Sequence, residues 1–235
     1  MNDRLSRRKE RFIKFVVILV CSAAFALTVK ATPFCTVSPT VWCEKEAGDA
    51  GSFPLTSAPT IGAGTLTDII GQLSNGSAGA DMYSIFIPDP SVFSANFTPD
   101  SNGGVTGLAA AALYLFDGAG DGIEAADDGS APLEGFTGPA GFYYIDIVPD
   151  GSLPQYKKKG NIFPIFANFT PGVDSPPAPG AGSLTSYSKT GCGADCQGGY
   201  DISLEGAEFS NLPEPASMLL TGLALAAVGL ARRRR

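Results

Sequence analysis

The 235-residue chain contains no histidine. Histidine is the usual general base near neutral pH, a member of the Ser-His-Asp and Cys-His arrangements, and the commonest zinc ligand. No Gly-x-Ser-x-Gly, Walker or dinucleotide-binding glycine motif follows a predicted strand. Carboxylates are abundant, but nothing in the sequence places two of them across a substrate. We therefore predict that the protein is not an enzyme.

Basic residues are scarce between the two ends of the chain. Of the 16 Lys and Arg, seven lie in residues 1–31 and four in 232–235, and two of the 23 Asp and Glu lie in 1–31. This leaves five basic against 21 acidic residues in 32–231, a formal charge of −16. Because nucleic-acid binding depends on Lys and Arg that neutralise phosphates, we expect no DNA or RNA partner. The charge is compatible with divalent cations and with an extracellular, solubilising surface.

The C-terminal apolar run is short for a membrane span. It extends over about 16 residues, from Ala216 to Ala231, whereas a bilayer span needs roughly 20. It is flanked by a tripeptide and by a basic cluster: Pro213-Glu214-Pro215 and Arg232-Arg233-Arg234-Arg235. The prolines hold the tripeptide extended, where a protease can bind it, and the arginines would stay on the cytoplasmic side.

The N-terminus has the organisation of a secretory signal peptide. Six basic side chains between Arg4 and Lys14 precede an apolar stretch from Phe15 to Val29. Small residues at the positions that signal peptidase reads predict cleavage after Ala31, so that 1–31 would be removed.

Four cysteines remain outside the predicted signal peptide: Cys35, Cys43, Cys192 and Cys196. An even number in an exported chain predicts disulfides, and three pairings are possible. We favour the local pairs Cys35–Cys43 and Cys192–Cys196, each of which closes a small loop. The alternative bridges the first pair to the second and ties the two ends of the domain together.

The region between the two signals, about 180 residues, is long enough for one sizeable core. Residues 32–64 are rich in Pro, Thr, Gly and Ala and predict an irregular lead-in. From Thr65 onward, short apolar runs alternate with Gly, Asp, Asn and Pro turns, which is typical of strands. The expected strands are 66–73, 81–87, 91–97, 112–116, 141–147, 161–169 and 200–204. In 81–87 we expect Met82, Ser84 and Phe86 on one face and Tyr83, Ile85 and Ile87 on the other, and the continuous apolar run 112–116 predicts a central strand buried on both sides. The sequence thus predicts an all-β sandwich or barrel.

An acidic stretch follows the apolar run 112–116. It places five carboxylates in the 13 residues from Asp117 to Gly129, with glycines that would let several oxygens converge on one ion. Ca²⁺ takes six to eight oxygen ligands and tolerates irregular loops. The candidate ligands are Asp117, Asp121, Asp127 and Asp128, with Asp81 as a further contributor. The alternative is a solvated hairpin whose Asp and Gly residues make turns.

The tripeptide, apolar run and arginines, Pro213 to Arg235, together resemble the PEP-CTERM sorting signal of Gram-negative bacteria. The resemblance implies that exosortase, an integral membrane enzyme, recognises the tripeptide and removes the tail. The chain would be anchored in the inner membrane only until that cut. It would then reach the cell surface or extracellular matrix, where such proteins accompany exopolysaccharide production and biofilm formation.

Three blocks between Thr65 and Phe209 resemble successive strands of the bacterial pre-peptidase C-terminal domain, a jelly-roll β-sandwich of secreted proteins. The residues that carry the resemblance are Asp81/Tyr83, Leu113/Leu115/Phe116/Asp117 with Asp127/Asp128, and Gly141/Tyr143/Tyr144. It implies a jelly-roll-like fold and, as in some related modules, calcium at the acidic turn. The chain departs from the pattern at Ala80 and is longer than expected between Pro149 and Tyr200.

The predicted organisation is a signal peptide (1–31), a lead-in (32–64), a β-sandwich domain (65–209) and a sorting signal with a short transmembrane helix (210–235). The predicted function is a non-catalytic structural or adhesive role at the surface or in the matrix. Its processing partners would be signal peptidase and exosortase, and its matrix partner an extracellular polysaccharide. The alternative is a calcium-dependent carbohydrate- or protein-binding module.

Overall fold

The computed structural model describes ten segments of the chain: 38–44, 50–73, 79–101, 107–108, 110–127, 132–149, 152–157, 160–163, 176–188 and 197–210, without the side chain of Asp127. The chain divides into two units, Met1–Ala31 and Thr32–Arg235, and all described residues belong to the second. Signal-peptide cleavage at this boundary stays a prediction.

Twelve strands account for most of the described residues. They are β1 (Val41–Cys43), β2 (Ala58–Pro59), β3 (Thr65–Leu73), β4 (Asp81–Ile87), β5 (Ser94–Asp100), β6 (Ala111–Phe116), β7 (Gly122–Asp127), β8 (Gly141–Pro149), β9 (Leu153–Tyr156), β10 (Gly160–Asn161), β11 (Leu184–Ser188) and β12 (Gly198–Phe209). A single 3-10 turn, η1 (Pro90–Val92), interrupts them. The predicted all-β class is confirmed for this part of the chain.

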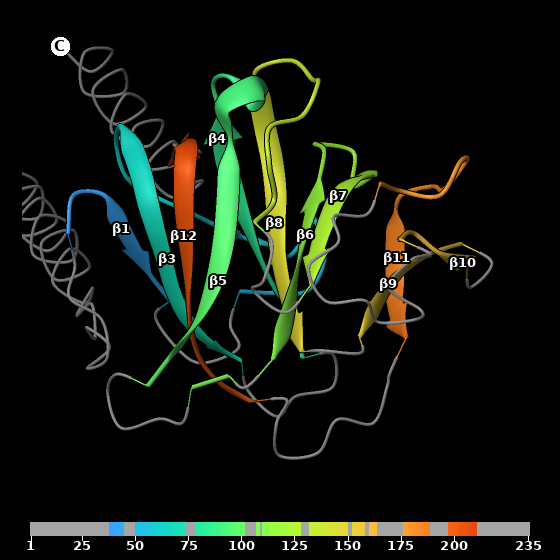
Figure 1. Cartoon of the computed structure of the whole chain (residues 1–235), viewed down its shortest axis with the longest axis horizontal. Coiled ribbons are helices and arrows are strands. Elements are labelled where there is room, and N and C mark those ends of the chain that lie inside the picture. The colour runs from blue at the N-terminus through green and yellow to red at the C-terminus, as the bar shows by residue number, and fades with distance from the viewer. Residues whose placement is uncertain are drawn as a thin grey trace, which may run out of the picture. The chain divides into compact units, whose positions relative to one another are not determined.

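The strands form a large sheet and a small one (Figure 1). The main path of the large sheet runs β1-β3-β12-β4-β8-β6-β7, with β2 paired to β4 and β5 paired to β12. The small sheet has the order β10-β9-β11. The β1–β3 and β2–β4 pairs are parallel, whereas the ladders that β12, β4, β8, β6 and β7 make with one another are antiparallel.

Alternate residues of β4, β6 and β8 face opposite sides of the sheet, as the period of a strand requires. On one side, Tyr83 and Ile85 of β4 belong to a large core cluster with residues of β3, β5 and β12. On the other side, Met82 of β4 and Tyr114 of β6 belong to a second cluster with residues of β9 and β11. The alternation predicted for 81–87 is confirmed. All six residues of β6 are buried, as its continuous apolar run predicts.

The long strand β12 joins the layer of β3 and β5 to the layer of β4, β8 and β6. Its first part pairs with β3 on one edge and with β5 on the other, whereas Glu208 and Phe209 pair with β4. The register against β3 shifts between Ser203 and Ala207, and Gly206 lies within this bulge at φ 72°. A bulge bends and twists a strand, so one strand serves both layers. This arrangement fits the predicted sandwich, while the jelly-roll connection order stays a prediction.

Three details differ from the sequence expectations. The lead-in 32–64 contains β1 and β2, whose parallel partners β3 and β4 the local sequence does not indicate. The strand expected at 91–97 begins at Ser94, because Asp89 caps η1: its Oδ1 accepts from the nitrogen and the Oγ of Ser91, at 3.0 and 2.7 Å. These bonds lower the pKa of Asp89. The acidic stretch 117–129 contains β7 rather than one loop.

Within the described segments, no helix has the length and apolar character needed to cross a membrane. The predicted transmembrane helix and the predicted signal peptide both lie outside these segments.

Candidate functional site

The acidic hairpin between β6 and β7 turns at Asp117. One carboxylate oxygen of Asp117 accepts hydrogen bonds from the nitrogens of Ala119 and Asp121, at 2.8 and 2.9 Å. The backbone closes the turn through bonds between Asp117 and Asp121 and from Gly120 to Asp117, each 2.9 Å. Gly120 has φ 84°, a conformation that favours glycine. The Asp and Gly residues here therefore build a turn, as the alternative interpretation predicts.

The same turn is connected to the strand that covers it. The Oγ of Ser183 donates to Oδ1 of Asp121 at 2.6 Å, and the nitrogen of Leu184 donates to the carbonyl of Gly120 at 3.0 Å. These bonds join the hairpin to the start of β11, so one oxygen of Asp121 is engaged within the protein.

The remaining calcium candidates are placed elsewhere. The backbone of Asp127 lies opposite Ala112, at the end of the hairpin away from the Asp117 turn. The five residue-to-residue steps from Gly122 to Asp127 span about 17 Å at roughly 3.4 Å each. Ligands of one Ca²⁺ lie 2.3–2.6 Å from the ion and therefore within about 5 Å of one another. The hairpin thus separates Asp117 and Asp121 from Asp127, and Asp128 lies outside the described residues.

Among the described side chains, no three Asp, Glu or Cys come together in a group suited to a metal. Calcium binding stays a prediction. A melting-temperature shift on calcium addition that is lost in Asp127→Asn but kept in Asp117→Asn would assign the ion to the far end of the hairpin.

Asp81 is the first residue of β4 and its side chain is bonded to β12. Its side chain is 2 % exposed, and the hydroxyl of Tyr200 donates to its Oδ2 at 2.8 Å. The hydroxyl of Tyr83 lies in hydrogen-bond contact with that of Tyr200. Nearby, the buried Glu44 accepts from the nitrogen of Gln72 at 2.7 Å. We define Asp81, Tyr83, Tyr200 and Glu44 as the inner polar cluster.

Burial raises the pKa of Tyr200 well above its usual value, and the nearby carboxylate of Asp81 raises it further. The tyrosine therefore stays a neutral donor. Trp42 packs edge-on against Tyr83, with ring centroids 5.1 Å apart. Because the inner polar cluster is enclosed by the core, it serves packing and hydrogen bonding and presents no surface to a substrate.

A second buried aspartate lies on the opposite face of the sheet. Asp146 on β8 is fully buried, and the hydroxyl of Tyr187 on β11 lies 2.7 Å from its Oδ2. The same hydroxyl lies 3.0 Å from the carbonyl of Ser52. The other carboxylate oxygen, Oδ1, has no hydrogen-bond partner among the described residues. Burial raises the pKa of Asp146 well above its usual value, the Tyr187 hydroxyl opposes the rise, and Asp81 adds to it.

The Tyr187 hydroxyl has two possible acceptors but only one proton. One Tyr187 hydroxyl carries a single proton, and a carbonyl and a carboxyl oxygen both lie within its reach. If Asp146 is protonated on Oδ2, it donates to Tyr187, which then donates to Ser52.

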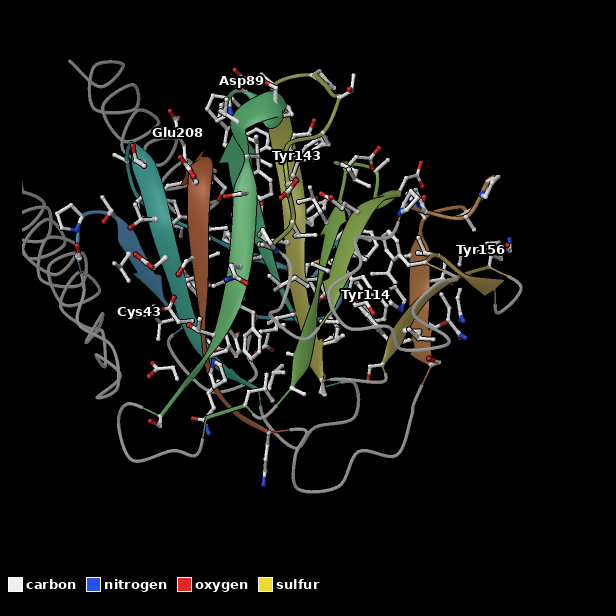
Figure 2. All side chains as sticks on the ribbon, viewed as in Figure 1. Cys43, Asp89, Tyr114, Tyr143, Tyr156 and Glu208 are labelled. Atoms are coloured by element: carbon white, nitrogen blue, oxygen red, sulfur yellow. The ribbon has the colours of Figure 1, made fainter. Side chains whose placement is uncertain are left out.

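Tyr114 of β6 lies on the same face of the sheet, in the cluster that includes residues of β9 and β11 (Figure 2). Its hydroxyl donates to the carbonyl of Ser152 at 3.2 Å.

The outward face of β12 carries a third acidic group. Asp201 is half-buried, and desolvation followed by repulsion from Asp68 and Asp100 raises its pKa to about 6. Its Oδ1 is buried and has no hydrogen-bond partner in the part of the chain that the structure describes. Asp68 accepts from the hydroxyl of Thr67 at 2.7 Å. These carboxylates repel one another across neighbouring strands.

The last described residue, Ser210, directly follows β12 and is bonded to Thr60. Ser210 is fully buried, and its nitrogen donates to the carbonyl and the Oγ1 of Thr60, at 2.9 and 3.1 Å. Its own hydroxyl donates to the same carbonyl at 3.1 Å. Thr60 is equally buried and donates from Oγ1 to the carbonyl of Ser84 on β4 at 2.7 Å. We call Thr60 and Ser210 the exit clamp; Glu208 lies just before it (Figure 2).

The residues after the exit clamp match a known sorting motif. Residues 211–235 match the PEP-CTERM protein-sorting motif, which includes every sorting residue named from the sequence. The motif defines an exported protein that is held transiently in the membrane and processed by exosortase. No curated protein and no solved structure matches the chain. The relation of the β-domain to the pre-peptidase C-terminal domain stays a prediction.

Of the four predicted disulfide cysteines, only Cys43, at the end of β1, is among the described residues. The pairing therefore stays a prediction. Sequence reasoning did not single out Thr60, Asp146, Tyr187 or Ser210. A signal existed for Asp146, because it is an acid inside the apolar run 142–148. No local signal existed for Thr60 and Ser210, which are 150 positions apart.

Proposed function

We propose that the protein is an exported surface or matrix component whose β-domain has a non-catalytic, structural or adhesive role beside exopolysaccharide. The observation that carries this proposal is the match of residues 211–235 to the PEP-CTERM sorting motif. Signal peptidase removes the N-terminal segment, the tail holds the chain in the inner membrane, and exosortase releases the body at Pro213-Glu214-Pro215.

The order of the tail residues gives a physical account of the transient anchor. An apolar run of about 16 residues is slightly short for a full span, so the membrane holds it less firmly than a long helix. The four terminal arginines resist transfer through the membrane and stop the chain. The Pro-Glu-Pro tripeptide then lies on the outer side, directly before the apolar run.

Four of the described carboxylates are held within the fold, which supports a role without catalysis. The carboxylates of Asp81 and Asp146 are buried, and those of Asp117 and Asp121 accept hydrogen bonds within the fold. The formal charge of −16 over 32–231 suits an extracellular surface that stays hydrated. Multivalent cations would bridge such a surface to an acidic polysaccharide.

The test is the intact mass of the protein from its native host, taken separately from cell-associated and secreted fractions. We expect a product that begins near Thr32 and ends close to Pro213–Pro215. The matched control replaces Pro213 and Pro215 with alanine and should keep the tail. A wild-type product that still carries Ala216–Arg235 would mean a permanent membrane anchor and would refute the sorting step.

The structural role has its own test. Deletion of the protein should reduce the polysaccharide retained by the cells, and restoration of the full chain should recover it. Restoration by a chain with alanine in place of Pro213 and Pro215 should fail. Unchanged retention in the deletion strain would refute the matrix role while leaving sorting intact.

A further inference from the structure

We infer that the folded β-domain itself limits exosortase processing, and that the exit clamp must open before the sorting tripeptide fits into the enzyme. This inference rests on the proposed function and concerns the regulation of the same site. The fully buried Ser210 lies only three positions before the sorting tripeptide in the sequence.

Only Asn211 and Leu212 separate Ser210 from Pro213. A fully extended chain advances at most about 3.6 Å per residue, so Pro213 lies within roughly 11 Å of Ser210. The apolar run begins at Ala216, within roughly 22 Å of the same point. When the apolar run is in the membrane, the body is held close to its surface.

A protease binds its substrate as an extended strand, because the enzyme makes backbone hydrogen bonds to residues on both sides of the cut. The residues before Pro213 must therefore be free of other backbone partners. Ser210 is not, since its nitrogen and hydroxyl both bond to Thr60. Just before it, the nitrogen of Phe209 donates to the carbonyl of Gly64 at 3.1 Å.

The fold provides a place where this end can open without loss of the remaining sheet. The register shift between Ser203 and Ala207, with Gly206 inside it, separates the last residues of β12 from the longer ladder before it. Opening from Ala207 onward breaks the pairs of Ala207 and Glu208 with β3 and those of Glu208 and Phe209 with β4. The ladder from Gly198 to Ser203 remains paired.

Opening has a cost that sets the rate. The ring of Phe209 is only 4 % exposed and would enter water, and the buried bonds of the exit clamp would break. The processing rate is proportional to the open fraction if opening is fast relative to cleavage. Substitutions at two residues, Thr60 and Gly62, should weaken the exit clamp by independent means.

Thr60→Val keeps the side-chain shape but removes the Oγ1 that accepts from Ser210 and donates to Ser84. Gly62→Ala acts through packing, because an added Cβ would lie 2.5 Å from the ring of Phe209 and force it to move. We expect Thr60→Val to raise the processing rate about fivefold, which corresponds to about 1 kcal/mol of opening free energy.

The decisive variant leaves the clamp intact and lengthens the tether. Six residues of alternating Gly and Ser, inserted between Ser210 and Asn211, add up to about 20 Å. We expect processing of the full chain, in the native host, to become about tenfold faster. In this longer chain Thr60→Val should have no further effect. Deletion of Asn211 and Leu212 should slow processing.

The matched control is the same insertion after Gly180, an exposed turn residue with open space around it. It adds the same length and composition far from the tripeptide in sequence and should process at the wild-type rate. Rates are measured by pulse-labelling and the loss of the tail mass with time.

The outcomes separate the inference from the proposed function. Faster processing after both tether insertion and clamp loosening supports the inference. Equal rates in the wild type and the tether insertion would overturn it while the proposed sorting stands. A tail that is retained in every variant would refute sorting itself, and the inference with it.

Discussion

The two faces of the β4–β8–β6 layer each bury an aspartate, but they provide it with different hydrogen-bond donors. Each buries an aspartate beneath a tyrosine hydroxyl from a distant strand: Asp81 beneath Tyr200, and Asp146 beneath Tyr187. On the first face, Asp81 accepts from the hydroxyl of Tyr200, and that hydroxyl is in turn hydrogen-bonded to the hydroxyl of Tyr83. On the second face, one oxygen of Asp146 has no partner within the described segments, and the tyrosine hydroxyl is shared with a carbonyl.

The number of donors determines which charge state of the aspartate each face stabilises. A buried carboxylate with sufficient donors can remain charged, whereas one with a shared donor is more stable as a neutral acid. The face beneath the small sheet should therefore respond to pH, and the face within the large core should depend on its tyrosine.

Tyr200→Phe should be the most destabilising single change. It removes the donor to Asp81 and the acceptor for Tyr83, within a core that water does not reach. Loss of a hydrogen bond to a buried charged group costs about 1.5–3 kcal/mol, and we expect about 3 kcal/mol here. The measurement is urea unfolding of the purified mature protein near neutral pH.

Tyr187→Phe is the matched control on the other face. If Asp146 is neutral, this change loses only an uncharged hydrogen bond, worth about 1 kcal/mol. Equal losses in the two variants would mean that both aspartates carry the same charge, and the contrast between the faces would fail.

Asp146→Asn should stabilise the protein at neutral pH. Because the folded-state pKa of Asp146 is raised above its unfolded value, the folded state holds a proton that the unfolded state has already released. Wild-type stability therefore decreases as the pH rises above about 4, the unfolded pKa, until the folded pKa is passed. Asparagine has the same shape and cannot ionise.

We expect the amide nitrogen introduced by Asp146→Asn to donate to the Tyr187 oxygen, as the protonated acid would. The variant should match the wild type near pH 3 and exceed it by about 1–3 kcal/mol near pH 7. Unfolding free energies at the two pH values give the answer. A variant that is less stable at both would show that Asp146 is charged and stabilising in the native fold.

The sequence predicted the parts of this contrast that depend on period. The alternation in 81–87 assigned Tyr83 and Ile85 to one face and Met82 to the other, and the continuous run 112–116 predicted a strand buried on both sides. The PEP-CTERM match likewise depends on contiguous residues, which a linear motif can carry.

The parts that the sequence did not predict depend on distant pairs. Asp81 and Tyr200 are 119 positions apart, and Asp146 and Tyr187 are 41 apart. The composition of the acidic stretch 117–129 indicated either a calcium site or a solvated turn. The sequence could not distinguish them, because glycines allow the backbone to form both. Its middle joins β7 because residues 124–127 pair with β6, and that pairing separates Asp117 from Asp127.

Asp201→Asn tests an intermediate case on the outward face of β12, and its effect should be the smallest. The folded pKa of Asp201, about 6, lies above its ordinary value of 3.8, so wild-type stability decreases between about pH 4 and pH 6 and then levels. Since the side chain is half-exposed, solvent screens the interaction, and we expect a gain of only about 1 kcal/mol near pH 7. Part of the gain comes from repulsion by Asp68 and Asp100, so it should shrink in high salt, whereas the gain in Asp146→Asn should not. A salt-independent gain at Asp201 would mean that desolvation alone raises its pKa, and the outward face would then differ from the Asp146 face only in degree.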